Sequence, residues 1–256
     1  MDAYTSFAEV YDLFMDNVPY DEWCTQIIKI LEDHGISSGI VAELGCGTGS
    51  LTERLADHGF DMIGIDNSED MLKIASDKNK NILYLLQDMR SFELYGTCAA
   101  IISRCDSLNY ITEYEDMIKV FKLVNNYLDP EGIFIFDINA PYKYEQILAN
   151  NTIAENRDEG SFIWENYYDE TTKINEYDLT IYIKDTLGDD IEACRFLRFE
   201  ETHYQRAYSI EEVKSAAEKA GLLFISVVDA DTLKEPCDNT ERYLISLKES
   251  GKGLKI

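Results

Sequence analysis

Basic residues and histidines are scarce in this chain of 256 residues. It contains 23 Lys and Arg against 49 Asp and Glu, which gives a formal net charge of −26, and only three His. Proteins that bind nucleic acid gain affinity when Lys and Arg neutralise phosphates, and basic patches bind anionic membrane surfaces for the same reason. The charge therefore argues against nucleic acid and membrane surfaces as partners.

Signals for export, membrane insertion and metal binding are also missing. The start, Met1-Asp2-Ala3-Tyr4, has neither the basic nor the apolar segment of a signal peptide. The apolar runs are far shorter than the ~20 residues that span a bilayer. The six cysteines form no CxxC pair and have few histidines near them, so we expect no metal site. Free thiols without a secretory signal favour a cytoplasmic protein.

What remains is the composition of a globular protein, with 45% hydrophobic and 28% charged residues. A chain of this length buries roughly 70–75% of the surface that its unfolded form exposes, so it needs no disulfide or metal to stabilise a core. We expect one large domain that carries a sizeable insertion.

The first 137 residues alternate between short apolar segments and segments with helical spacing. Strands that are apolar on both faces and alternate with helices indicate a parallel sheet with helices on both sides. The predicted strands are 40–44, 60–66, 82–86, 98–103 and 133–137. The predicted helices are 21–34, a segment around 51–56, 69–76 and a segment around 117–128, and 129–132 is read as a turn.

The pattern changes after Pro141. Segments rich in Tyr, Phe, Ile and Thr predict an antiparallel meander of three strands, 161–168, 174–185 and 191–207, separated by turns at 169–172 and 187–190. The Ser-x-x-Glu spacing of Ser209 and Glu212 predicts a capped helix over 210–220, which Gly221 ends. Two further strands, 222–228 and 242–247, are expected to close the first sheet as an antiparallel pair.

The predicted fold is therefore α/β, with a doubly wound, mostly parallel seven-stranded sheet and an inserted antiparallel β meander. Residues 1–140 and 208–256 form the main domain, in which 1–34 is an N-terminal helical cap. Residues 141–207 form the inserted subdomain, which we expect on the substrate side.

The strongest motif is Glu43-Leu44-Gly45-Cys46-Gly47-Thr48-Gly49, between the first strand and the next helix. Glycines allow a sharp turn and let a ligand lie against bare backbone. A helix N-terminus offers unpaired N–H groups, which suit a carboxylate or phosphate. A turn without a ligand is the alternative, but three alternating glycines favour a binding loop.

Two aspartates end the neighbouring strands. Asp66 lies 21 positions beyond Gly45, where an acidic residue accepts hydrogen bonds from ribose hydroxyls. Asp88 follows the third strand, in a position to accept a hydrogen bond from an adenine amino group, with Met89 or Met71 against the ring. An ordinary surface residue is the alternative for Asp66, and an acidic turn residue is the alternative for Asp88.

These motifs resemble those of the class I S-adenosylmethionine-dependent methyltransferases, which have a Rossmann-like fold. The resemblance rests on 43–49, 64–72 and 87–89 and covers about 1–140 and 208–248. Tyr11-Asp12, the segment 19–23 and the segment 105–110 are similar to small bacterial members grouped with glycine- and sugar-amine N-methyltransferases.

The resemblance implies S-adenosylmethionine as the cofactor and a role for each matching residue. Glu43, Gly45 and Gly47 would hold its methionine moiety, Asp66 its ribose hydroxyls, and Asp88 and Met89 its adenine. Cys46, Asn67 and Met71 would also contact the cofactor. Arg104 and Cys105 would lie beside the sulfonium, and Tyr4, Tyr11, Tyr20 and Trp23 would fold over the site. Aromatic faces stabilise such a cation.

Methyl transfer by in-line displacement depends mainly on alignment of the reactants, and a general base is optional for an amine. Tyr11, Tyr110 and His203 are the catalytic candidates, although a lone histidine is more often structural. The segment after the fourth strand lacks the Asn/Asp-Pro-Pro-Tyr/Phe motif of base-amine DNA methylation. We therefore expect a small-molecule acceptor, an amine in preference to a hydroxyl.

Two alternatives remain at this stage. A non-catalytic S-adenosylmethionine-binding module would have the same motifs. A nicotinamide-dependent oxidoreductase also uses a glycine-rich first turn, but its spacing is Gly-x-Gly-x-x-Gly. A monomer and a homodimer are both compatible with the sequence.

Overall fold

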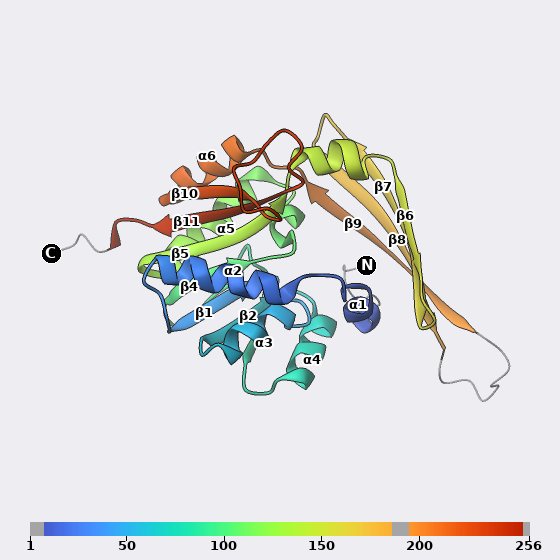
Figure 1. Cartoon of the computed structure of the whole chain (residues 1–256), viewed down its shortest axis with the longest axis horizontal. Coiled ribbons are helices and arrows are strands. Elements are labelled where there is room, and N and C mark those ends of the chain that lie inside the picture. The colour runs from blue at the N-terminus through green and yellow to red at the C-terminus, as the bar shows by residue number, and fades with distance from the viewer. Residues whose placement is uncertain (1–7, 186–194, 253–256) are drawn as a thin grey trace.

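A seven-stranded sheet forms the larger part of the computed structural model, which describes residues 8–185 and 195–252 (Figure 1). The strand order is β10-β11-β5-β4-β1-β2-β3. β1 to β5 run parallel, whereas β11 is antiparallel to both β5 and β10. The strands are β1 (Ile40–Leu44), β2 (Asp61–Asp66), β3 (Leu83–Leu86), β4 (Cys98–Ser103), β5 (Leu128–Asn139), β10 (Leu222–Asp229) and β11 (Arg242–Glu249). The predicted fold class is confirmed.

Helices cover both faces of this sheet because its strands are apolar on both sides. In β5, Ile133 and Ile135 belong to one core and the alternate residues Phe134 and Phe136 to the other. α2 (Tyr20–Asp33) and α3 (Ser50–Asp57) pack on the first core, and α5 (Tyr114–Tyr127) and α6 (Ile210–Ala220) on the second. The other α-helices of the described residues are α1 (Ala8–Phe14) and α4 (Glu69–Lys78). Within the described ranges no helix has the length and apolar character needed to cross a membrane.

The predicted helix boundaries of α6 are confirmed, together with their cause. The Ser209 hydroxyl accepts a hydrogen bond from the Glu212 N–H, and the Glu212 carboxylate accepts one from the Ser209 N–H. This reciprocal pair satisfies N–H groups that the first helical turn leaves free. Gly221 ends the helix in the left-handed conformation, with φ 77°.

The inserted segment forms a second, antiparallel sheet that extends away from the first (Figure 1). It has four strands rather than the predicted three, namely β6 (Thr152–Asn156), β7 (Gly160–Asp169), β8 (Ile174–Lys184) and β9 (Phe196–Arg206). A π-helical turn, η2 (Lys143–Leu148), precedes it. The predicted turn at 187–190 and the first residues of the predicted strand, 191–194, lie outside the described residues.

The predicted turn at 129–132 is wrong. These residues belong to β5, whose register with β4 shifts between Cys98 opposite Leu128 and Ala100 opposite Ile133. Extra residues in one strand of a pair form a bulge, and Glu131 adopts a positive φ of 66° there. The Pro-x-Gly sequence thus bends the strand without ending it.

A short 3₁₀ helix, η1 (Ser107–Tyr110), joins the two sheets. The fully buried Asn109 accepts a hydrogen bond from the Asn139 N–H at 2.8 Å and donates to the Arg206 carbonyl at 2.8 Å. One side chain therefore connects the ends of β5 and β9 and sets how the inserted sheet meets the main domain.

We predict that Asn109→Leu lowers the free energy of unfolding by about 2–4 kcal/mol, because it leaves a buried N–H and a carbonyl without partners. Urea denaturation monitored by circular dichroism measures this loss. Asn126→Leu, on the exposed side of α5, is the control and should change stability little. Equal stability of the two variants would contradict the role of Asn109.

Candidate functional site

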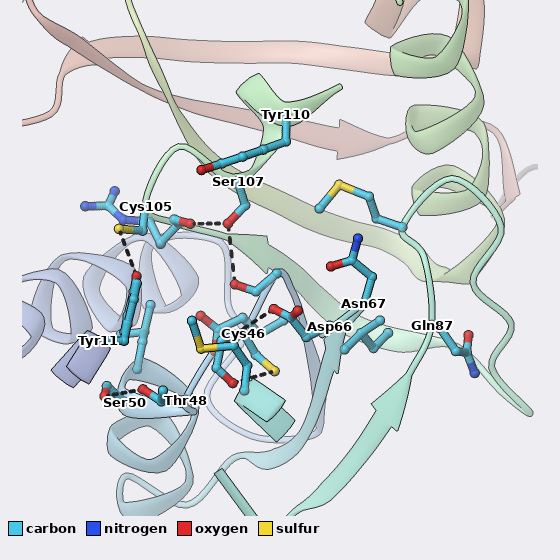
Figure 2. A pocket seen from close by; sticks show the side chains of 18 of the residues that line it. Tyr11, Cys46, Thr48, Ser50, Asp66, Asn67, Gln87, Cys105, Ser107 and Tyr110 are labelled. Atoms are coloured by element: carbon cyan, nitrogen blue, oxygen red, sulfur yellow. Dashed lines mark hydrogen bonds between the residues drawn. The ribbon is translucent and has the colours of Figure 1, made fainter. Parts of the chain in front are cut away.

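One cavity lies where the loops after β1, β2, β3 and β4 meet the N-terminal helices α1 and α2 (Figure 2). Carboxyl ends of parallel strands are the usual place for a ligand in such a sheet. The lining residues are Tyr11, Tyr20, Trp23, Glu43, Gly45, Cys46, Gly47, Thr48, Ser50, Leu51, Ile65, Asp66, Asn67, Met71, Gln87, Asp88, Met89, Arg90, Arg104, Cys105, Ser107, Tyr110 and Ile111.

The structure brings together around this cavity all the residues that the sequence assigned to a cofactor. Tyr11 and Tyr110 line it as well, whereas His203 does not, and Tyr4 lies outside the described residues. No described residue of the inserted segment lines this cavity, so the segment reaches it only through residues of the main domain. The sequence assigned no role to eight lining residues, each within four positions of a residue that was assigned: Thr48, Ser50, Leu51, Ile65, Gln87, Arg90, Ser107 and Ile111.

The glycine-rich loop presents bare backbone to the cavity. Gly45, Gly47 and Gly49 have positive φ angles of 71°, 53° and 78°. Residues with a Cβ rarely adopt this backbone conformation. A Cβ on Gly45 would lie 2.5 Å from the Ser107 Oγ. At Gly47 a Cβ would meet nothing within 4 Å, so the space above this residue is open to a ligand.

Asp66 holds the loop in place from the end of β2. Its carboxylate accepts hydrogen bonds from the Gly47 N–H at 2.8 Å and the Ser68 N–H at 2.9 Å. Burial raises the pKa of Asp66, while the backbone N–H groups oppose this rise. In Figure 2, Asp66 lies between Cys46 and Asn67 on the wall of the cavity. A carboxylate in this position can still accept further hydrogen bonds on its remaining lone pairs.

The Asp88 carboxylate has a partner within the chain. It accepts hydrogen bonds from the Arg90 Nε at 3.0 Å and the Arg90 Nη2 at 2.5 Å, and these bonds hold the pKa of Asp88 below its usual range. The assigned role of Asp88 toward adenine stays a prediction. An adenine amino group would share this carboxylate with Arg90.

Glu43 is a buried carboxyl group in the wall of the cavity, 3% exposed. Its Oε2 accepts a hydrogen bond from the Thr52 hydroxyl at 2.5 Å. Burial raises the pKa of Glu43 to about 8, and the nearby charge of Asp66 adds to this rise. A cationic group bound beside Glu43 would favour its ionised form.

Arg104 is a buried cation whose N–H groups lack hydrogen bonds. Its side chain is 1% exposed, its Nε lies 3.2 Å from Asp137 Oδ2, and its guanidinium lies 4.4 Å from the centre of the Trp23 ring. No described residue hydrogen-bonds any of its three guanidinium nitrogens. Burial lowers the pKa of Arg104. Unpaired buried donors are costly, and a bound carboxylate would satisfy those of Arg104 in the paired geometry that a guanidinium favours.

Aromatic residues of the N-terminal helices close the cavity on the side of Cys105. The Tyr20 and Trp23 rings meet edge to face with centroids 5.7 Å apart, and the Tyr11 hydroxyl lies 3.9 Å from the Cys105 Sγ. Burial raises the pKa of Cys105 to about 12, so the thiol is neutral at physiological pH. This wall suits a cation, because ring faces attract positive charge.

His203 lies behind the cavity rather than in it. It is 2% exposed, and its Nδ1 lies 3.2 Å from the Tyr110 hydroxyl, which is the group that lines the cavity. Elsewhere in the described ranges, no group of three or more His, Cys, Asp or Glu side chains is arranged to hold a metal ion.

Comparisons with known proteins agree with this geometry. A family model described as a methyltransferase domain matches residues 41–132. YqeM of Bacillus subtilis (strain 168), which is named as a methyltransferase without a stated acceptor, is 35% identical over 253 residues, 96% of this chain and 97% of that protein. An S-adenosylmethionine-dependent methyltransferase from Clostridium acetobutylicum ATCC 824 has a crystal structure with a TM-score of 0.85 at 30% identity, covering 98% of this chain and 100% of that one.

A third relative shares less of the sequence. The dTDP-3-amino-3,4,6-trideoxy-alpha-D-glucopyranose N,N-dimethyltransferase of Streptomyces venezuelae is 24% identical over 149 residues, 57% of this chain and 62% of that protein.

The chain therefore belongs to the S-adenosylmethionine-dependent methyltransferases. It is an enzyme, and its cofactor is S-adenosylmethionine. This assignment decides against the two alternatives left open by the sequence, a nicotinamide-dependent oxidoreductase and a non-catalytic module.

The raised pKa of Glu43 predicts a pH-dependent stability of the ligand-free protein. Between the ordinary value of 4.5 and about 8, the folded protein binds a proton that the unfolded chain has lost, so stability falls as pH rises through this range. Glu43→Gln removes this dependence. Between pH 5 and pH 9, the free energy of unfolding of the wild type should therefore fall by about 2–4 kcal/mol more than that of the variant.

Chemical denaturation at several pH values measures this difference. Glu22→Gln, at an exposed position of α2, is the matched control and should follow the wild type at every pH. A Glu43→Gln curve parallel to that of the wild type would show that Glu43 is ionised in the folded protein.

Proposed function

We propose that the enzyme methylates a nitrogen atom of a small-molecule amine bound at the Ser107 and Tyr110 end of the cavity. The observation that supports this most is the continuity of one cavity, from the glycine-rich loop past Cys105 to Tyr110 and Ile111. When bound, S-adenosylmethionine supplies an electrophilic methyl group on a sulfonium, and the protein supplies alignment and a suitable field.

We assign the two ends of the methionine moiety to two buried side chains of opposite charge. Glu43 would accept its ammonium group, and Arg104 would bind its carboxylate, since the Arg104 guanidinium is ion-paired with Asp137 but none of its nitrogens has a hydrogen bond among the described residues. The open space above Gly47 would take the chain between them, with Gly45 and Cys46 beside it.

The nucleoside would lie on the other side of the loop. Asp66 would accept hydrogen bonds from the ribose hydroxyls, and Asn67 would donate one to them. Met71, Asp88 and Met89 would surround the adenine. Tyr11, Trp23 and Cys105 would lie near the sulfonium, where aromatic faces and a neutral thiol avoid repulsion with a cation.

An amine suits this enzyme better than a hydroxyl on grounds of charge. Alkyl amines are mostly cationic at neutral pH, since their pKa is about 10, and an acidic protein attracts such ligands. The Streptomyces venezuelae relative acts on an amino sugar, as its name states. The same charge disfavours nucleic acid, and we expect a cytoplasmic enzyme that acts as a monomer or a homodimer.

We further propose a division of labour within the chain. Residues 1–140 and 208–256 would bind the cofactor, with 1–34 as its cap, and residues 141–207 would act on the acceptor side through Tyr110.

A panel of matched acceptors tests the proposed reaction. Each pair has the same skeleton with an amine or a hydroxyl: glucosamine and glucose, ethanolamine and ethanediol, glycine and glycolate. Release of S-adenosylhomocysteine is measured with S-adenosylmethionine saturating. We expect release with amines and little with their partners, and release only with hydroxyl or carboxylate compounds would contradict the proposal.

Binding of two ligands tests the assignment of Arg104. S-adenosylhomocysteine has the amino-acid moiety, and 5′-methylthioadenosine lacks it. A hydrogen bond to a charged group contributes about 1.5–3 kcal/mol. Arg104→Met should therefore lower the affinity for S-adenosylhomocysteine by roughly 10–100-fold and leave the affinity for 5′-methylthioadenosine unchanged.

Calorimetry measures both affinities. Arg198→Met, on the exposed side of β9, removes a cation of the same kind far from the cavity and should change neither affinity. An equal loss for both ligands in Arg104→Met would indicate damage to the fold rather than a lost carboxylate contact.

A further inference from the structure

The inserted sheet places a buried glutamate and a buried histidine directly behind the acceptor end of the cavity. Glu201 and His203 lie two positions apart on β9, so both point to the same face of the sheet. Their side chains are 2% and 0% exposed. In front of them, Tyr110 of η1 lines the cavity, and Figure 2 shows it above Ser107, on the opposite side from Gln87.

Hydrogen bonds connect Glu201 to His203 and His203 to Tyr110. The His203 Nε2 lies 3.1 Å from the Glu201 Oε2, and a carboxylate there can only accept, so in the neutral imidazole this contact favours the proton on Nε2. The Nδ1 then has a lone pair, and it lies 3.2 Å from the Tyr110 hydroxyl. The phenol therefore donates to His203, and its oxygen also shares a short hydrogen bond with the Tyr177 hydroxyl.

The surrounding sheet holds the imidazole in this orientation. Tyr177 of β8 is paired with His203 in the strand register, and the two rings stack with centroids 4.7 Å apart and planes 6° from parallel. Tyr110 meets the His203 ring edge to face at 5.8 Å. A carboxylate behind a histidine commonly sets its tautomer and stabilises its charged form.

We propose that Tyr110, His203 and Glu201 form a proton relay that accepts a proton from the acceptor amine. The inference deepens the proposed function and rests on it. One N–H proton of the bound ammonium moves to the Tyr110 oxygen as the Tyr110 proton moves to the His203 Nδ1. The amine nitrogen gains its lone pair, and His203 becomes an imidazolium beside the Glu201 carboxylate. Tyr110 is neutral before and after, and the proton returns to solvent once the product has left.

In this relay Tyr110 is the catalytic residue, and His203 and Glu201 are positioning residues. The relay also explains how the inserted segment takes part in the reaction although none of its described residues lines the cavity.

Nitrogen-15 NMR of the imidazoles tests the hydrogen bonds without an acceptor. The chain has only three histidines, His34, His58 and His203, so single substitutions of the other two assign the spectrum. The protein is saturated with S-adenosylhomocysteine. We expect His203 as the neutral Nε2–H tautomer.

Two variants perturb the relay from its two ends. Tyr110→Phe should move the chemical shift of the His203 Nδ1 toward the value of an imidazole nitrogen whose lone pair accepts no hydrogen bond. Glu201→Gln should release the fixed tautomer, because an amide can donate as well as accept. The controls are Tyr204→Phe and Glu200→Gln, the same substitutions at exposed positions of β9, which should leave the His203 signals unchanged. An Nδ1–H tautomer, an imidazolium, or a spectrum insensitive to Tyr110→Phe would overturn the relay.

Turnover with the amines of the panel gives a second readout. A general base contributes about 10²–10⁴-fold, so Tyr110→Phe should lower kcat by at least about 100-fold, and Glu201→Gln by a smaller factor, with the affinity for S-adenosylhomocysteine unchanged. Unchanged kcat in Tyr110→Phe would overturn the relay while leaving N-methylation intact. A panel without any transfer would instead contradict the proposed function, and the tautomer of His203 would still decide whether the hydrogen bonds exist.

Discussion

The hydrogen bond from the Gly47 N–H to the Asp66 carboxylate is the contact on which the cavity depends. Parallel strands end side by side, and the loop after β1 must cross the end of β2 to reach α3. The N–H groups of Gly45 and Cys46 donate to the Ile65 carbonyl at 2.8 and 3.1 Å, and Asp66 takes the next free N–H. The glycine part of the loop is thus held by its neighbour strand through its backbone, while the Thr48 hydroxyl donates to Asp12 at 2.6 Å. A ligand that contacts Asp66 contacts the group that shapes its own binding loop.

The second constraint is the turn after β4, which links the cavity to the inserted sheet. Cys105 and Asp106 have positive φ angles of 59° and 50°, a costly conformation for residues with a side chain. Asp106 is held by its surroundings: its N–H donates to Asp137, and its carboxylate accepts from Gln205 at 2.7 Å and Arg242 at 3.1 Å. Because Gln205 belongs to β9, the same network that fixes this turn also fixes the strand that carries His203. The position of Tyr110 relative to the cavity follows from both.

The sequence was informative where one residue type has one physical meaning. Apolar runs predicted the strands of the main sheet, Ser209 and Glu212 predicted a helix start, and alternating glycines predicted a bare turn. The prediction from sequence failed at 129–132, because a Pro-x-Gly bulge and a turn have the same composition. It also failed at β6, an edge strand whose residues are mostly exposed and carry little apolar pattern. The environment of His203 could not be predicted either. Its partner Tyr110 lies 93 positions away in the chain, and nothing in the local sequence marks a histidine that contacts a cavity-lining residue.

These two constraints separate the tasks of the two sheets. Described residues of the main sheet and its loops and helices line the whole cavity, and the inserted sheet touches this lining from behind, through Gln205 at the turn after β4 and through His203 at Tyr110. What the insertion does control is the group behind Tyr110, since β9 brings both Glu201 and His203 to one point of its inner face. Burying a carboxyl group and an imidazole is unfavourable unless each has a partner, and here each is the partner of the other. An apolar contact at this position would cost less than this buried pair against Tyr110, and the proposed relay gives a reason for that cost.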